Sequence, residues 1–364
     1  MTAEPALTVI EVAKQSAKAA GLRYVTDQSP GITRQRRGKS FVYKNADGTA
    51  VKDADTLARV KALVLPPAWE NVWICSSANG HLQATGRDAK GRKQSRYHAD
   101  FRATRDEAKY DRVIEFAAAL PKLRRTVARH LALRGLPKEK VLATIVSLLE
   151  KTLIRVGNDE YARTNNSYGL TTIRDEHATV KGSHIRFSFK GKSGVKHDIE
   201  LTSPKLAKIV RQCQELPDQE LFAYLDDAGQ WHDVKSNDVN AYLHDVTGGH
   251  FTAKDFRTWA GTVLAAKALR EFEKFDSQAQ AKKNVVAAIE HVAGRLGNTK
   301  AVCRKCYVHP AILDSYLSGS LIDQLQHRAE REMKHLAKLP PEEAAVVTLL
   351  QQQLKRARPR RKSA

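Results

Sequence analysis

The sequence is short of acidic residues, cysteines and long apolar runs, and each shortage excludes a class of protein. No apolar run approaches the roughly 18 residues that a membrane-spanning helix needs, so no membrane partner is expected. The opening segment MTAEPALTVIEVAKQSAKAA lacks a basic stretch followed by a small-residue cleavage site, so it does not predict a secretory signal. We therefore expect a cytoplasmic protein, and its 364 residues are enough for two or three domains.

The four cysteines, Cys75, Cys213, Cys303 and Cys306, are too few and too scattered for a disulfide framework. Cys303 and Cys306 have the spacing of a zinc or redox pair, but no second such pair occurs. Small side chains packed on a helix explain them better. The sequence therefore predicts no metal and no other cofactor.

The shortage of acidic residues is the most informative one. Lysine and arginine number 61 against 40 aspartates and glutamates, which gives a formal net charge of +21. Cations placed on phosphates release condensed counterions, so such an excess favours a nucleic-acid partner. The alternative is ordinary solubility with an incidental basic bias.

The first hundred residues predict a β-rich domain, because short apolar runs are separated by turn sequences such as Ser29-Pro30-Gly31. One helix is predicted near Asp55, with Val60 and Val64 on its buried face and Pro66-Pro67 at its end. The predicted strands are Leu22–Val25, Ser40–Tyr43, Asn71–Cys75 and His81–Thr85.

Helical spacing takes over after Phe101, so we place a domain boundary near residue 103. The exception is a predicted β-hairpin, in which Ile185, Phe187 and Phe189 alternate with polar residues and a glycine-rich tip follows. The predicted class is α+β: a small β-rich domain (1–102), a mainly helical domain with one hairpin (103–335), and a C-terminal helix with a basic tail (336–364). The tail sequence KRARPRRK has too few apolar groups to pack, so we expect it to be disordered and to add nonspecific affinity for DNA.

Breaking a DNA strand without water or metal makes three chemical demands. A hydroxyl must attack phosphorus, fixed cations must meet the charge on the non-bridging oxygens, and the departing sugar oxygen needs a proton. Arginine suits the second task, since its planar fork matches pairs of phosphate oxygens, and lysine suits the third because an ammonium can give up a proton.

Segments with these residue types occur in one order along the chain, and together they resemble the catalytic blocks of type IB DNA topoisomerases. The compact length resembles the bacterial and poxvirus-like branch of that family. The segments are Lys151–Glu160 (KTLIRVGNDE), Tyr168–Arg174 (YGLTTIR), Phe187–Ser193 (FSFKGKS), Phe251–Thr258 (FTAKDFRT), Leu296–Thr299 (LGNT) and Cys303–Pro310 (CRKCYVHP).

The resemblance implies a role for each of five residues. Tyr307 is the expected nucleophile, Arg155 and Arg257 the expected phosphate contacts, and Lys192 the expected general acid. Asn298 stands where many family members have histidine, so it can donate a hydrogen bond to phosphate but cannot act as an acid. Taken singly, each residue also has a structural explanation. Arg155 is then a cation at a helix end, Lys192 a solvated charge on a hairpin, and Arg257 an arginine with a snorkelling stem. Asn298 is then a turn residue, and Tyr307 a core or surface tyrosine.

A basic stretch at the end of the first domain is the expected DNA contact, because its cations alternate with residues that can hydrogen-bond to base edges. The alternative is a solvated basic loop. The stretch resembles the DNA-contacting segment of the family, although Ser95 stands where a tyrosine is common. The candidate DNA-binding residues are Arg92, Lys93, Gln94, Arg96 and Tyr97, with Lys254 in the second domain.

What the resemblance implies is a monomer that closes as a clamp around duplex DNA at the nucleoid. A 3′-phosphotyrosyl link at Tyr307 would allow controlled swivelling and religation without ATP or metal. Two alternatives stay open. One is a tyrosine recombinase, which shares the chemistry, although recombinases usually have histidine at the position of Lys254 and a helical N-terminal domain. The other is a noncatalytic DNA-binding protein that uses only the charge.

Overall fold

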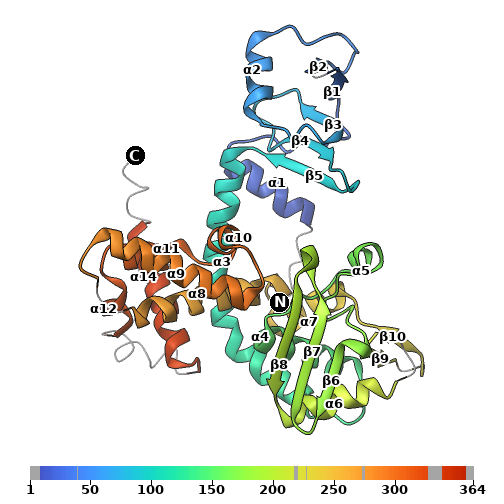
Figure 1. Cartoon of the computed structure of the whole chain (residues 1–364), viewed down its shortest axis with the longest axis vertical. Helices are drawn as coiled ribbons and strands as arrows, with labels where there is room; N and C mark the ends of the chain where they lie inside the picture. Colours follow the sequence, from blue (N-terminus) through green and yellow to red (C-terminus); the bar gives the residue numbers. More distant parts are fainter. Residues whose placement is uncertain are drawn as a thin grey trace, which may run out of the picture. The chain divides into compact units, whose positions relative to one another are not determined.

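The computed structural model describes residues 9–38, 40–216, 220–226, 228–272, 275–326 and 338–357 (Figure 1). The chain divides into two compact units, Met1–Tyr110 and Asp111–Ala364, here called unit 1 and unit 2. The division falls within a long helix, α3 (Ala99–His130).

Unit 1 is built on a five-stranded antiparallel sheet in the order β2-β1-β3-β4-β5. Its small core consists of apolar side chains from the three central strands and from one helix, with Ile74 and Ala84 fully buried. The elements are α1 (Val9–Ala19), β1 (Gly31–Arg37), β2 (Ser40–Lys44), α2 (Ala54–Ala62), β3 (Glu70–Cys75), β4 (Leu82–Arg87) and β5 (Lys93–Tyr97).

The prediction of a β-rich first unit is confirmed, but several details of it are wrong. The run Leu22–Val25 is no strand, since Arg23 makes only an isolated bridge to Gly80. The side chain of Asp53, not Asp55, caps α2. Val64 lies beyond the end of that helix at φ 47° and is 74% exposed, so it does not share the buried face.

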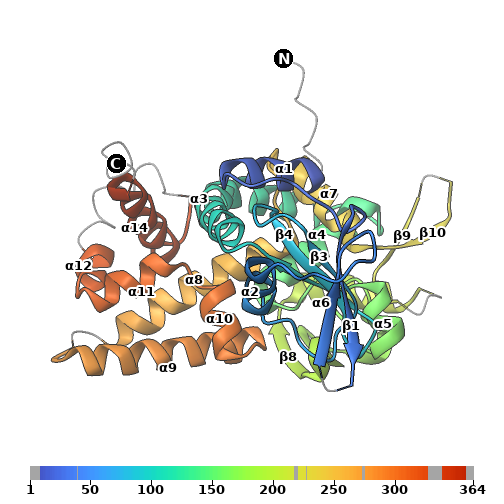
Figure 2. The same cartoon turned by 90° about the horizontal axis from the view of Figure 1, so that it is seen from above.

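Unit 2 is mainly helical, and α8 and α9 lie side by side in it (Figure 2). Its further helices are α4 (Lys138–Thr152), α5 (Asp159–Asn165), α6 (Pro204–Gln214), α7 (Ser236–Thr247), α8 (Ala253–Glu271), α9 (Gln278–Leu296), α10 (Lys300–Cys306), α11 (Pro310–Leu317), α12 (Leu321–Gln326) and α14 (Pro341–Ala357). No helix in the described part of the chain is both long and apolar enough to cross a membrane.

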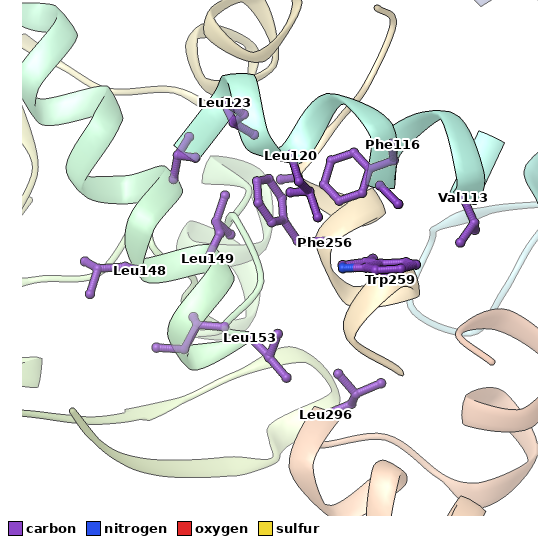
Figure 3. Packing of buried hydrophobic residues seen from close by; sticks show 14 of the residues in the cluster. Val113, Phe116, Leu120, Leu123, Leu148, Leu149, Leu153, Phe256, Trp259 and Leu296 are labelled. Carbon is purple, nitrogen blue, oxygen red and sulfur yellow. The ribbon is translucent and has the colours of Figure 1, made fainter. Parts of the chain in front are cut away.

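Part of the core of unit 2 lies between α3, α4, α8 and α9 (Figure 3). Phe116 of α3 packs edge to face on Phe256 of α8 there, and Leu296 at the end of α9 belongs to the same cluster. Every residue of α4 from Lys140 to Leu149 is buried, so this helix is surrounded by the core. It also ends at Thr152, so Arg155 lies in the irregular segment that follows the helix.

The predicted hairpin is confirmed as β7 (His184–Lys190) and β8 (Lys196–Thr202), with Ile185, Phe187 and Phe189 on the buried face. It is not the only sheet structure in unit 2, as the sequence had suggested. β6 (Ala178–Lys181) adds a third strand beside β7, and β9 (Ala223–Leu225) with β10 (Trp231–Asp233) forms a separate hairpin at the edge of the unit.

Candidate active site

Tyr307 lies directly after α10 and is half-buried against α8. Its N–H donates to the carbonyl of Cys303 at 2.9 Å, and its carbonyl accepts from the hydroxyl of Thr262 at 3.4 Å. Gly261 allows this approach, because a Cβ there would lie 2.7 Å from the Tyr307 carbonyl oxygen. Contacts with α10 and α8 therefore fix the backbone of the candidate nucleophile.

Arg257 faces the ring of Tyr307, with its guanidinium carbon 5.2 Å from the ring centroid. It is only 4% exposed, so it is not the snorkelling surface arginine of the structural alternative. One Nη donates to the carbonyl of Leu153 and the other to the carbonyl of Leu296 at 2.6 Å. Both carbonyls belong to helix C-terminal ends that lack intrahelical partners, so Arg257 joins α8 to the ends of α4 and α9.

Burial lowers the pKa of Arg257, and the neighbouring charge of Arg155 lowers it further, while Tyr307 acts in the opposite direction. A guanidinium stays protonated at neutral pH even so. Its Nε is buried and has no hydrogen-bond partner within the described residues. One donor of this arginine is thus still available beside the tyrosine.

Arg155 contacts Asn298, whose side-chain oxygen accepts from Nη2 of the arginine at 2.5 Å. Asn298 follows Gly297, which ends α9 in the left-handed conformation at φ 57°. The amide nitrogen of Asn298 is buried and, among the described residues, has no partner. The asparagine therefore offers a second unused donor next to an arginine.

The segment that carries Arg155 is held by a close contact between two glycines. A Cβ at Gly169 would lie 2.6 Å from the Arg155 carbonyl oxygen and 2.6 Å from Gly157. The N–H of Leu170 donates to that carbonyl at 2.9 Å. Two of the segments that carry the resemblance, Lys151–Glu160 and Tyr168–Arg174, are therefore packed against each other.

Lys192 lies at the tip of the β7–β8 hairpin and is exposed. The tip is closed by the N–H of Gly191, which donates to the carbonyl of Val195 at 2.8 Å, and Ser193 has a positive φ of 64°. In the part of the chain that the structure describes, the ammonium group has no hydrogen-bond or ion-pair partner. The lysine is free to meet a ligand.

One residue of the site was missed from the sequence. His197, on β8, is half-buried between the lysine tip and the end of α9. Burial lowers the pKa of its imidazole, and the charges of Arg155 and Arg257 lower it further. The available signal was a polar side chain at an inward position of the strand that follows the candidate lysine.

Two other tyrosines of unit 2 have structural roles. Tyr316 is 1% exposed, and its hydroxyl accepts from the side-chain amide of Asn284 at 2.7 Å. Tyr168 packs beside His177 and Arg174. Of these three tyrosines, Tyr307 is the one whose ring faces the candidate Arg257.

Arg257 faces Tyr307, Arg155 contacts Asn298, and the charges of both arginines reach His197. The site thus combines arginines with an amide and an imidazole, which are donors suited to an anion. Among the described residues, no group of three or more histidine, cysteine, aspartate or glutamate side chains could hold a metal ion. Cys303 is buried on α10, and burial raises the pKa of its thiol to about 11, which fits the predicted packing role.

The candidate DNA-binding residues of unit 1 lie on and beside β5, and acidic residues pair with several of them. Asp88 accepts from Arg92 and Gln94, and Lys93 lies 2.6 Å from Asp27. The hydrogen bond from Arg92 lowers the pKa of Asp88 to about 2.

The remaining three candidates differ in exposure. Arg96 is half-buried and donates to the carbonyl of Val64 at 3.3 Å, whereas Tyr97 is 37% exposed. Lys254 is exposed in the first turn of α8 in unit 2.

Comparisons with known proteins show the family to which the chain belongs. A family model described as eukaryotic DNA topoisomerase I, catalytic core, matches residues 98–338, and one described as bacterial DNA topoisomerase IB, N-terminal domain, matches residues 40–88. DNA topoisomerase 1B of Acanthamoeba polyphaga mimivirus is 31% identical over 293 residues, which cover 79% of this chain and 87% of the viral protein. DNA topoisomerase 1B of Vaccinia virus (strain Copenhagen) is 20% identical over 260 residues, or 70% of this chain and 78% of that protein.

The matches define the class of protein as an isomerase that acts on DNA. This chain belongs to the type IB DNA topoisomerases, and its N-terminal part matches the bacterial form of that family.

Proposed function

We propose that the protein relaxes supercoiled duplex DNA by transient single-strand cleavage, swivelling and religation, without ATP or metal. The observation that carries the proposal is a pair of unused donors among the described residues: Nε of Arg257, whose guanidinium faces Tyr307, and the amide nitrogen of Asn298, which contacts Arg155. A buried donor without a partner costs about 1–3 kcal/mol, so such groups favour a ligand that supplies acceptors. The two non-bridging oxygens of a phosphodiester are acceptors of this kind.

Each proposed role follows from the position of a side chain. The phenol oxygen of Tyr307 bonds to phosphorus while the bond from phosphorus to the 5′ oxygen breaks, and the phenol proton leaves to solvent. Arg257, Arg155 and Asn298 stabilise the charge that develops on the phosphate oxygens. Lys192 gives a proton to the departing 5′ oxygen. Religation reverses these steps, and the 3′-phosphotyrosyl link retains the energy of the broken bond.

We propose further that one copy of the chain closes as a clamp on duplex DNA at the nucleoid in the cytoplasm. Unit 1 contacts DNA through Arg92, Lys93, Gln94, Arg96 and Tyr97, and unit 2 adds Lys254 beside the active site. The exposed positions of Lys93, Tyr97 and Lys254 support these contacts. The formal charge of +21 supports a polyanionic partner.

The test is relaxation of supercoiled plasmid in EDTA without ATP by wild type, Tyr307→Phe and a control, Tyr224→Phe. Tyr224 is another half-buried tyrosine of unit 2, on β9, so its variant loses one phenol oxygen outside the site. Wild type and Tyr224→Phe should relax the plasmid and form a covalent adduct, whereas Tyr307→Phe should bind DNA and do neither. An adduct that persists in Tyr307→Phe contradicts the proposal.

A further inference from the structure

His197 fills the space between two glycines that belong to different parts of the active site. A Cβ at Gly191, at the base of the lysine tip, would lie 2.6 Å from both Cδ2 and Nε2 of the imidazole. A Cβ at Gly297, just before Asn298, would lie 2.7 Å from its Cε1. The ring is therefore in van der Waals contact with both backbones, and neither position has room for a side chain.

The ring is also fixed from the hairpin side. His197 is the cross-strand partner of Phe189, and their rings stack at 5.0 Å with an interplanar angle of 22°. Phe189 is itself 6% exposed and belongs to the core of unit 2. A stacked ring pair of this kind has little freedom to move. A shift of the backbone at Gly191 therefore pushes the imidazole against Gly297, and the reverse also holds.

We propose that His197 is a positioning residue that sets the Lys192 tip against the turn carrying Asn298. This inference rests on the proposed function, because it assigns a role in placing the proton donor relative to the phosphate contacts. Lys192 has no side-chain partner within the described residues, so its position depends on the backbone of the tip. The backbone of the tip, at Gly191, and the end of α9, at Gly297, both contact the imidazole of His197.

The first test is a suppressor experiment on single-turnover cleavage at saturating DNA. Gly191→Ala places a methyl group against the imidazole and should slow cleavage, although φ −94° is open to alanine. His197→Ala empties the space and should also slow cleavage, by about 10²-fold, the scale for a small misplacement of a catalytic group. The double variant Gly191→Ala/His197→Ala should be no slower than His197→Ala alone, because the added methyl group then has no imidazole to displace. Additive defects would overturn the proposal.

A conservative variant and a matched control separate position from stability. His197→Gln fills much of the same space with a neutral planar group and should retain most of the cleavage rate. His184→Ala removes the same side chain from the far end of the hairpin, where His184 is exposed and contacts Thr202, and should cleave like wild type. Thermal unfolding of all variants shows whether a slow one is merely unstable. A His197→Ala protein that cleaves as fast as wild type contradicts the inference.

The second test uses a substrate whose 5′ bridging oxygen is replaced by sulfur. If His197 acts through Lys192, the defect of His197→Ala should shrink on this substrate, as that of Lys192→Ala should, because a thiolate leaves without a proton. Equal His197→Ala defects on both substrates, with Lys192→Ala rescued, would overturn the inference alone. A wild-type protein that forms no covalent adduct would instead overturn the proposed function.

Discussion

The side-chain oxygen of Asn298 accepts a hydrogen bond from Arg155 at 2.5 Å, and this leaves the amide nitrogen of Asn298 as a buried, unpaired donor. Arg155 thus orients the side-chain amide of Asn298, with the oxygen toward the guanidinium and the nitrogen away from it. In this chain the donor at position 298 is neutral, and a neighbouring cation sets its orientation.

Asn298→Asp should slow cleavage more than Asn298→Ala. Aspartate retains an acceptor for Arg155, but it replaces the N–H donor with an oxygen and adds negative charge beside the phosphate. Alanine only removes the donor, and water can replace it. Single-turnover cleavage at saturating DNA checks the order, and an aspartate variant faster than the alanine variant would show that the free amide nitrogen does not face phosphate.

Arg257→Ala should lower the cleavage rate by roughly 10²–10³, the scale for one donor to a developing anion, and more than Asn298→Ala does. Unlike Asn298, Arg257 also donates to the carbonyls of Leu153 and Leu296, so its variant should be less stable as well. The two effects are separated by measuring cleavage well below the unfolding temperature. The ranking is wrong if Asn298→Ala proves the slower of the two.

Lys192→Ala should be slow on ordinary DNA and much less impaired when the 5′ bridging oxygen is sulfur. Arg257→Ala should gain little from sulfur, because the non-bridging oxygens still need a cation. Arg155→Ala should recover in part if it shares the proton path. Matched cleavage rates on the two substrates measure this difference, and equal Lys192→Ala defects would reduce the lysine to a phosphate contact.

Asp27→Asn should tighten nonspecific binding of duplex DNA. The carboxylate lies 2.6 Å from Lys93, and the hydrogen bond from Lys93 holds the pKa of Asp27 below its usual value, so the pair is fully formed at neutral pH. Releasing Lys93 to a phosphate should steepen the slope of log affinity against log salt by about 0.9. Asp47→Asn removes the same charge from a turn of unit 1 and serves as the control. An unchanged slope in Asp27→Asn would mean that Lys93 does not reach phosphate.

Truncation after Ala357 should weaken DNA binding at low salt and flatten its salt dependence, since it removes four of the six cations in the basic tail. The predicted tail lies largely outside the described residues, whereas α14 ends at Ala357 and is retained whole. Cleavage at saturating DNA should not change. A large loss of the cleavage rate at saturating DNA would mean that the tail takes part in the cleavage reaction.

The parts of the fold that could be predicted from the sequence were those with a local signal. Alternation of Ile185, Phe187 and Phe189 with polar residues identified the hairpin. β5 was missed as a strand because its sequence, KQSRY, has no apolar face and lies at the edge of the sheet. β9 and β10 were missed because each has three residues, too few for a periodic pattern.

The site could be predicted by resemblance but not its internal contacts. For Arg257 the sequence offered a phosphate contact and, as the alternative, a snorkelling surface arginine, but not its burial. That burial depends on the ends of α4 and α9, which are far from it in sequence. The pairing of Arg155 with Asn298 likewise joins residues 143 positions apart. His197 was missed, because nothing local in the sequence indicates the two glycines that enclose it.

Arg257 connects the integrity of the fold to the chemistry. Its guanidinium closes the carbonyl ends of α4 and α9 and at the same time faces the ring of Tyr307. Loosening of either helix end would free the arginine from its carbonyl partner and from its place beside the tyrosine. Under the proposed mechanism, a half-folded copy that keeps its basic surface would still bind DNA, but it would lack the assembled pair that cuts. Such a copy would occupy DNA without nicking it.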